Sequence, residues 1–78
     1  MREGEEIFER VFLLRMLTRE ADETIEDITA SLANTGMFDI EYGNRLRERL
    51  EKESFIVGGE LSLKGMLEAK KAETEFRL

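Results

Sequence analysis

The segment from residue 54 to residue 63 constrains the fold of this 78-residue chain most, because its hydrophobic period differs from that of its neighbours. The letters SFIV at 54–57 are mainly aromatic and β-branched, Gly58-Gly59 follows, and the letters ELSL at 60–63 alternate polar and apolar residues. Two short runs joined by two glycines predict a β-hairpin with a tight two-residue turn.

The two-residue turn also fixes the expected register of the hairpin. Val57 is then opposite Glu60, and Ile56 is opposite Leu61. Side chains two positions apart on a strand share a face. We therefore expect one face of the hairpin to point to the core and the other to need a further covering element. The expected core face holds Ile56, Leu61 and Leu63, and the other face holds Phe55 and Val57.

Three helices are expected before this hairpin. The first covers residues 5–20. The second starts near Thr24, where Thr24 and Asp27 form a capping-box pattern, and it ends before Gly36. Asp39 is a suitable N-cap for a third helix that runs to about Glu53. Two helices joined by a short turn with glycine are typical of a helix-turn-helix arrangement.

The first helix is apolar on nearly all sides, since eight of the eleven residues from Ile7 to Leu17 are apolar. Such a helix must be buried on more than one side. One interpretation is a central helix wrapped by the others, and the other is a homodimer or protein-partner interface, which would help a small domain. The residues expected at that interface, with the outer side of the hairpin added, are Ile7, Phe8, Phe12, Leu13, Met16, Leu17, Phe55 and Val57.

A last helix is expected from Lys64 to about Phe76. Met66, Leu67 and Ala69 are expected on its inward side. Lys70 and Lys71 lie late in the helix, where cations interact favourably with the helix dipole.

The order helix, helix, helix, hairpin, helix, together with the letters RLRERLEKESFIVGGELSLKGMLEAKK at 45–71, resembles the winged helix-turn-helix family. This resemblance implies a mainly α fold with a small β-hairpin. It also implies a transcriptional regulator whose third helix enters the major groove of duplex DNA. The apolar first helix predicts that such a regulator is a dimer. The residues that the resemblance assigns to DNA are Asn44, Arg45, Arg47, Arg49, Lys52 and, beside the hairpin, Lys64.

The charges of the third helix favour an alternative. Residues 39–53 hold five acids and four bases, and every base has an acid four residues away, as in the pairs Glu41–Arg45 and Arg47–Glu51. The hairpin tip has no Lys or Arg to contact phosphate. The alternative is a protein-interaction module on the same scaffold that does not bind DNA, with the acidic first half of the chain meeting a basic partner.

Composition excludes several functional classes. The chain has no Cys and no His, and its net charge is −6. It therefore has no thiolate nucleophile, no soft-metal site and no imidazole base, and we expect neither an enzyme nor a cofactor. The carboxylates at Asp22, Glu23, Glu26 and Asp27 are compatible with Mg²⁺ or Mn²⁺, but they are expected to form a solvated acidic face.

We expect residues 1–78 to form a single domain that does not enter a membrane. The longest apolar run, Val11 to Leu14, is far shorter than the roughly 20 residues of a spanning helix. The first letters, MREGEE, are acidic where a signal peptide would be basic. These two features predict a cytoplasmic protein.

Overall fold

The computed structural model describes the backbone of residues 2–76 and the side chains of residues 7–75. The described chain is mainly helical with one small antiparallel hairpin, as the sequence predicted. Its elements in chain order are α1 (Arg2–Leu17), α2 (Ile25–Asn34), α3 (Ile40–Lys52), β1 (Ile56–Val57), β2 (Glu60–Leu61) and α4 (Leu63–Phe76).

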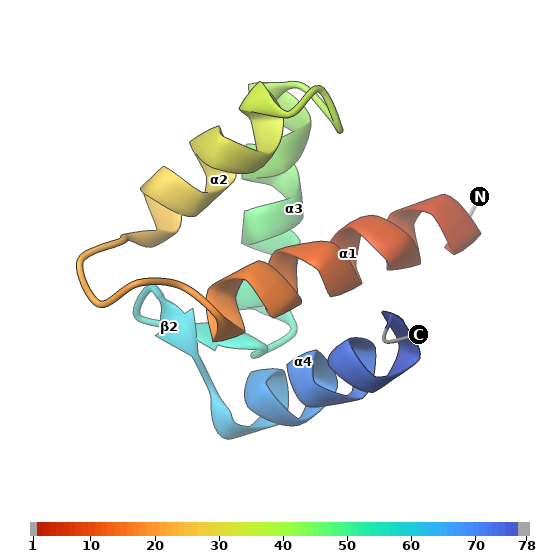
Figure 1. The fold of residues 1–78 in the computed structure, drawn as a ribbon, viewed down its shortest axis with the longest axis vertical. Coiled ribbons are helices and arrows are strands. Elements are labelled where there is room, and N and C mark those ends of the chain that lie inside the picture. The colour runs from red at the N-terminus through yellow and green to blue at the C-terminus, as the bar shows by residue number, and fades with distance from the viewer. Residues whose placement is uncertain (1, 77–78) are drawn as a thin grey trace.

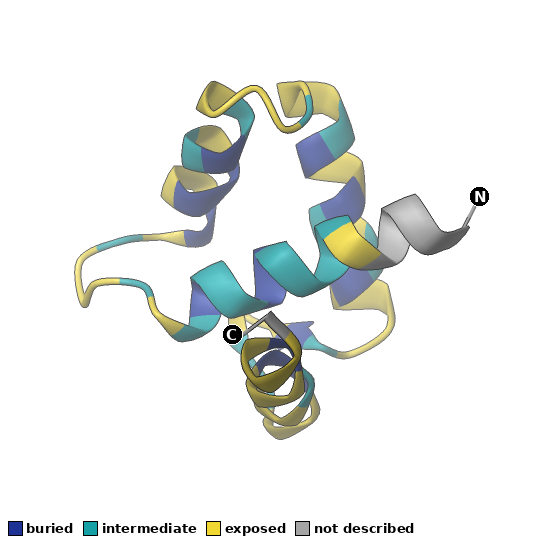
Figure 2. Ribbon diagram, turned by 45° about the vertical axis from the view of Figure 1, so that its right-hand side comes forward, coloured by how far each residue is buried: buried dark blue, intermediate teal, exposed yellow. Residues whose placement is uncertain are grey.

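Helix α1 lies between the α2–α3 pair and α4 (Figures 1 and 2). The sequence predicted that it would extend to residue 20, but α1 ends at Leu17. The reason lies in the polar residues that follow it. The amide of Glu20 donates to the Glu23 carboxylate at 2.9 Å, and the Arg19 guanidinium donates to the Glu23 carbonyl at 3.0 Å, which turns the chain toward α2.

The predicted starts of α2 and α3 are confirmed. The Thr24 hydroxyl accepts from the Asp27 amide at 3.2 Å, and the Asp27 carboxylate accepts from the Thr24 amide at 3.1 Å, which completes the capping box. The Asp39 carboxylate accepts from the Tyr42 amide at 2.8 Å. These short-range bonds satisfy amides that a helix start leaves without partners.

The hairpin has the predicted register, with Ile56 opposite Leu61 and Val57 opposite Glu60. Its two-residue turn needs a positive φ at both positions, and the glycines at 58 and 59 have φ values of 62° and 80°. The chain enters β1 through a tight end of α3, in which Ser54 has a φ of 69° and the Phe55 amide donates to the Leu50 carbonyl at 2.9 Å.

The hydroxyl of Ser62 joins the hairpin to α4. It donates to the Ser54 and Phe55 carbonyls at 2.5 and 3.2 Å, and it accepts from the Gly65 amide at 3.0 Å, so Ser62 is the N-cap of α4. Gly65 in the first turn lies very close to β1. A Cβ atom there would overlap the Phe55 carbonyl oxygen, which only glycine avoids.

Helix α1 supplies the centre of the hydrophobic core. Phe12, Leu13 and Met16 are buried within the chain, so they cannot belong to an exposed partner face. The prediction that these three side chains form an interface is wrong, because α2, β2 and α4 all pack against α1. The buried hydrophobic residues are Phe12, Leu13, Met16, Ile25, Ile28, Leu32, Leu46, Leu50, Ile56, Ala69 and Ala72.

Three more predictions about the core are corrected on the C-terminal side. Leu63 was expected on the core face of the hairpin, but it begins α4 and is 72% exposed. Met66 and Leu67 were expected on the inward side of α4, and they are 38% and 63% exposed. Ala69 is buried, as predicted, and Gly65 and Ala72 complete the inward side of α4, because small residues let the helix lie close to α1 and the hairpin.

Candidate functional site

The residues that the sequence assigned to DNA do not form one free basic surface. Asn44, Arg45 and Lys52 are exposed on α3, and neither Arg45 nor Lys52 forms an ion pair with a described residue. Arg47 and Arg49 are only partly exposed. The structure therefore brings three of the five α3 residues to the solvent and holds the other two against neighbouring helices.

Arg47 and Arg49 bind acids of other helices instead of acids within α3. A guanidinium nitrogen of Arg47 lies 3.4 Å from the Glu26 carboxylate on α2, and Nε of Arg49 lies 3.3 Å from the Glu9 carboxylate on α1. Nε of Arg47 is buried and has no hydrogen-bond partner among the described residues. Both arginines thus help to hold α3 in place, and contact with a ligand would require them to exchange these partners.

Lys64 is also occupied. Its Nζ donates to the Glu53 carbonyl at 2.9 Å and lies 4.5 Å from the centre of the Phe55 ring. The ammonium therefore caps the C-terminal end of α3, where carbonyl groups favour a cation. Lys64 joins α4 to the end of α3 and to Phe55, which precedes β1, and this structural role was not indicated by the sequence.

The exposed face of α3 is slightly acidic. Its charged and exposed members are three acids, Glu41, Glu48 and Glu51, and two bases, Arg45 and Lys52, a net charge of −1. Duplex DNA carries a dense negative charge, and proteins bind it through neutralising Lys and Arg side chains. This face supplies no such excess of positive charge.

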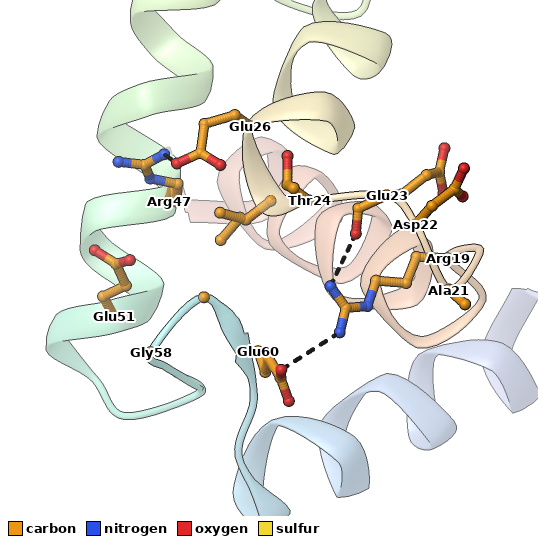
Figure 3. Close-up of a pocket in the computed structure, with 12 residues that line it drawn as sticks. Arg19, Ala21, Asp22, Glu23, Thr24, Glu26, Arg47, Glu51, Gly58 and Glu60 are labelled. Atoms are coloured by element: carbon orange, nitrogen blue, oxygen red, sulfur yellow. Dashed lines mark hydrogen bonds and ion pairs between the residues drawn. The ribbon is translucent and has the colours of Figure 1, made fainter.

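A groove of about 540 Å³ lies between α3, the hairpin tip and the segment that joins α1 to α2 (Figure 3). Arg19 crosses one side of it and lies 3.9 Å from the Glu60 carboxylate (Figure 3). Both arginines of the groove, Arg19 and Arg47, thus contact acids. The five carboxylates that line the groove are Asp22, Glu23, Glu26, Glu51 and Glu60. Its surplus of acids extends the negative potential of the α3 face.

The carboxylate of Glu23 is the most perturbed group near this groove. Arg15 donates two hydrogen bonds to it, at 2.9 and 2.6 Å. These bonds and the Glu20 amide lower the pKa of Glu23 from 4.5 to about 2, and the same pairing raises the pKa of Arg15. Glu23 is therefore ionised at neutral pH and fixes the end of α1 to the following loop. No group of three or more acids among the described residues is arranged to hold a metal ion.

Three of the exposed large hydrophobic residues lie close together in the sequence of α4. They are Leu63, Met66 and Leu67. The yellow colour of most of α4 in Figure 2 marks its exposure. Lys70 and Lys71 are exposed on the same helix and form no ion pair with a described residue. We call these five residues (Leu63, Met66, Leu67, Lys70 and Lys71) the α4 outer face.

The other residues expected at a partner interface have mixed positions. Ile7 is 49% exposed and Val57 is 62% exposed. Phe8, Leu17 and Phe55 are partly buried and pack against the core. The ring centre of Phe8 lies 5.7 Å from that of Phe38 and 5.5 Å from that of Tyr42. These three rings therefore pack against one another within the chain.

No protein-family model, curated protein or solved structure matches this chain. None of the described helices combines the length and the apolar character that crossing a bilayer requires. The function must therefore be inferred from the chemistry of the exposed surfaces.

Proposed function

We propose that this protein is a protein-interaction module on a helix-turn-helix scaffold of the winged-helix type and that it does not bind DNA through α3. The observation that carries the proposal is the α4 outer face, where exposed leucines gather on one helix. Exposed apolar side chains that cluster in this way are typical of protein contact sites. The two leucines Leu63 and Leu67 are separated by one helical turn, so they lie side by side on the surface.

The electrostatics of α3 supports the same proposal. A recognition helix reads base edges with Arg, Lys, Asn or Gln and is positioned by contacts to phosphate. Here two of the four basic residues of α3 are bound to Glu26 and Glu9, and the rest share the exposed face with three glutamates. The hairpin tip adds Glu60 instead of a base. Each of these acids would repel a phosphate backbone.

The proposal is tested by comparing two surface variants of the full chain. Wild-type protein immobilised on beads is expected to retain a partner from an extract of the source cells, and Leu63→Ser/Leu67→Ser is expected to lose that partner. Val57→Ser is the matched control, because Val57 is exposed to the same degree as Leu67 but lies on β1. The proposal would be contradicted if Val57→Ser lost the partner while Leu63→Ser/Leu67→Ser still bound it.

A second candidate function is binding of duplex DNA. Arg45 favours it, since this arginine is exposed on α3 beside Asn44 and has no ion-pair partner among the described residues. Fluorescence anisotropy with random duplex DNA at low and moderate salt tests it. Our first proposal expects no binding by the wild type at either salt concentration. Binding at low salt that Arg45→Glu abolishes would establish DNA binding in its place.

A further inference from the structure

We infer that the partner of the α4 outer face is an acidic amphipathic helix of another protein, which lies along α4 with its apolar side on Leu63 and Leu67. This inference rests on the proposed function and adds the chemistry of the partner to it. Its basis is the placement of charge around the exposed leucines.

The apolar and basic side chains of α4 share one side of the helix. At 100° per residue, Leu63, Leu67, Lys70 and Lys71 fall within an arc of about 100°. The side chains of Ala69 and Ala72 occupy the opposite side, where they are buried. The two exposed leucines, with lysines beside them, offer a surface along which a second amphipathic helix can lie.

The acids of α4 lie away from the centre of this face. Glu68, Glu73 and Glu75 are each at least about 90° from its middle on the same helical wheel. Glu75 is already bound to Arg10 on α1, at 2.9 Å. Lys70 and Lys71 therefore meet an incoming partner before these acids do, and glutamates or aspartates at the border of the partner's apolar stripe would complement them.

The lysines also argue against the other occupants of this face. In a contact between two copies, the Lys70 and Lys71 side chains of both would border the same small apolar patch and repel one another. An anionic membrane or a DNA duplex would also attract the lysines, but each extends beyond α4 and would meet the acids of the rest of the chain, whose net charge is −6. A single acidic helix that lies along α4 meets the lysines without covering those acids. An acidic amphipathic helix would cover the leucines with its apolar side and place its carboxylates beside the lysines.

The test uses the full ¹⁵N-labelled chain and two synthetic peptides of roughly 15 residues, a length at which an isolated helix begins to be stable in water. Both peptides have leucines spaced three and four residues apart. One has glutamates at the flanking positions, and the other has lysines there. We expect the glutamate peptide to bind at least about tenfold more tightly, with the largest amide shifts in residues 63–71 and with weaker binding as salt increases.

Protein variants then assign the binding to the named residues. Lys70→Glu/Lys71→Glu is expected to weaken binding of the glutamate peptide about tenfold or more, whereas the control Lys52→Glu on α3 leaves it unchanged. Equal binding of the two peptides, or shifts centred outside α4, would overturn the inference. Binding of anionic vesicles, of duplex DNA or of a second copy by the wild type in place of the peptide would also overturn it.

The two proposals can fail separately. If the extract partner depends on Leu63 and Leu67 but the charge of the peptides makes no difference, the interaction module stands and the acidic-helix inference falls. If the extract partner does not depend on these leucines, the proposed function itself fails, whatever the peptides do.

Discussion

Helices α1 and α4 pack against each other, yet their apolar residues serve different purposes. In α1 the large side chains Phe12, Leu13 and Met16 are buried among the other elements. In α4 the buried positions are small, and the large side chains Leu63 and Leu67 point to solvent. The number of apolar residues in a helix therefore says little about exposure. What decides it is whether the helix lies in the middle of the fold or at its edge (Figure 1).

The strongest test of this comparison is truncation of Phe12 at the centre of α1. Phe12→Ala removes a fully buried ring, so we expect a loss of about 3–5 kcal/mol in the free energy of unfolding. Urea unfolding at several protein concentrations measures it. The loss should be the same at every protein concentration. A loss that depends on protein concentration would indicate that Phe12 lies at an intermolecular interface. Phe12→Leu is a milder variant for the case in which the alanine variant does not fold.

A second test concerns the close contact between Gly65 of α4 and the Phe55 carbonyl. In Gly65→Ala the new methyl group would overlap the Phe55 carbonyl, so we expect a loss of about 1–3 kcal/mol from overpacking. Alanine is intrinsically better than glycine in a helix, which makes a loss here informative. Thr74→Ala on the exposed side of α4 is the control for a change of helix propensity. A gain of stability in Gly65→Ala would show that α4 is not held against the Phe55 carbonyl.

The link between α1 and its following loop can be tested by pH. Because the pKa of Glu23 is lowered to about 2 in the folded chain from an ordinary 4.5, its ionised form stabilises the fold above pH 4.5. That contribution is lost as the pH falls from 4.5 toward 2. Glu23→Gln should therefore melt at a lower temperature than the wild type at neutral pH, and the two melting temperatures should converge near pH 2. A difference that is constant across this range would contradict the assigned pairing with Arg15.

The smallest effect is expected on the α4 outer face. Leu67→Ser changes a side chain that is 63% exposed, so the free energy of unfolding should change by no more than about 0.5 kcal/mol. The comparison with Phe12→Ala in the same urea experiment then separates an exposed leucine, for which we propose a binding role, from a buried phenylalanine that stabilises the fold. A loss of several kcal/mol in Leu67→Ser would place Leu67 in the core after all.

Local chemistry was predictable from the sequence, and long-range packing was not. The caps at Thr24 and Asp39 and the hairpin register follow from residues within five positions of one another, so each local stretch of sequence contains both partners. The pairs that the sequence indicated for Arg47 and Arg49 were within α3. Their actual partners, Glu26 and Glu9, lie on α2 and α1 and depend on how three helices meet.

The candidate site shows the same division. The exposed positions of Asn44, Arg45 and Lys52 follow from the buried stripe of Leu46 and Leu50 on the same helix. The α4 outer face could not be deduced in this way, because leucine in a short amphipathic pattern is normally an inward residue. Only the close approach of Gly65 and the burial of Ala69 and Ala72 reveal that the helix turns its small side inward.

Ser62 couples the β-hairpin to α4. One hydroxyl donates to carbonyls that precede β1 and accepts from the first turn of α4, so we expect the base of the hairpin and the beginning of the helix to open together. Amide protons of residues 56–66 would consequently exchange with deuterium as a single cooperative unit. A helix that docks on α4 would slow that exchange in the hairpin as well, although it touches none of its residues.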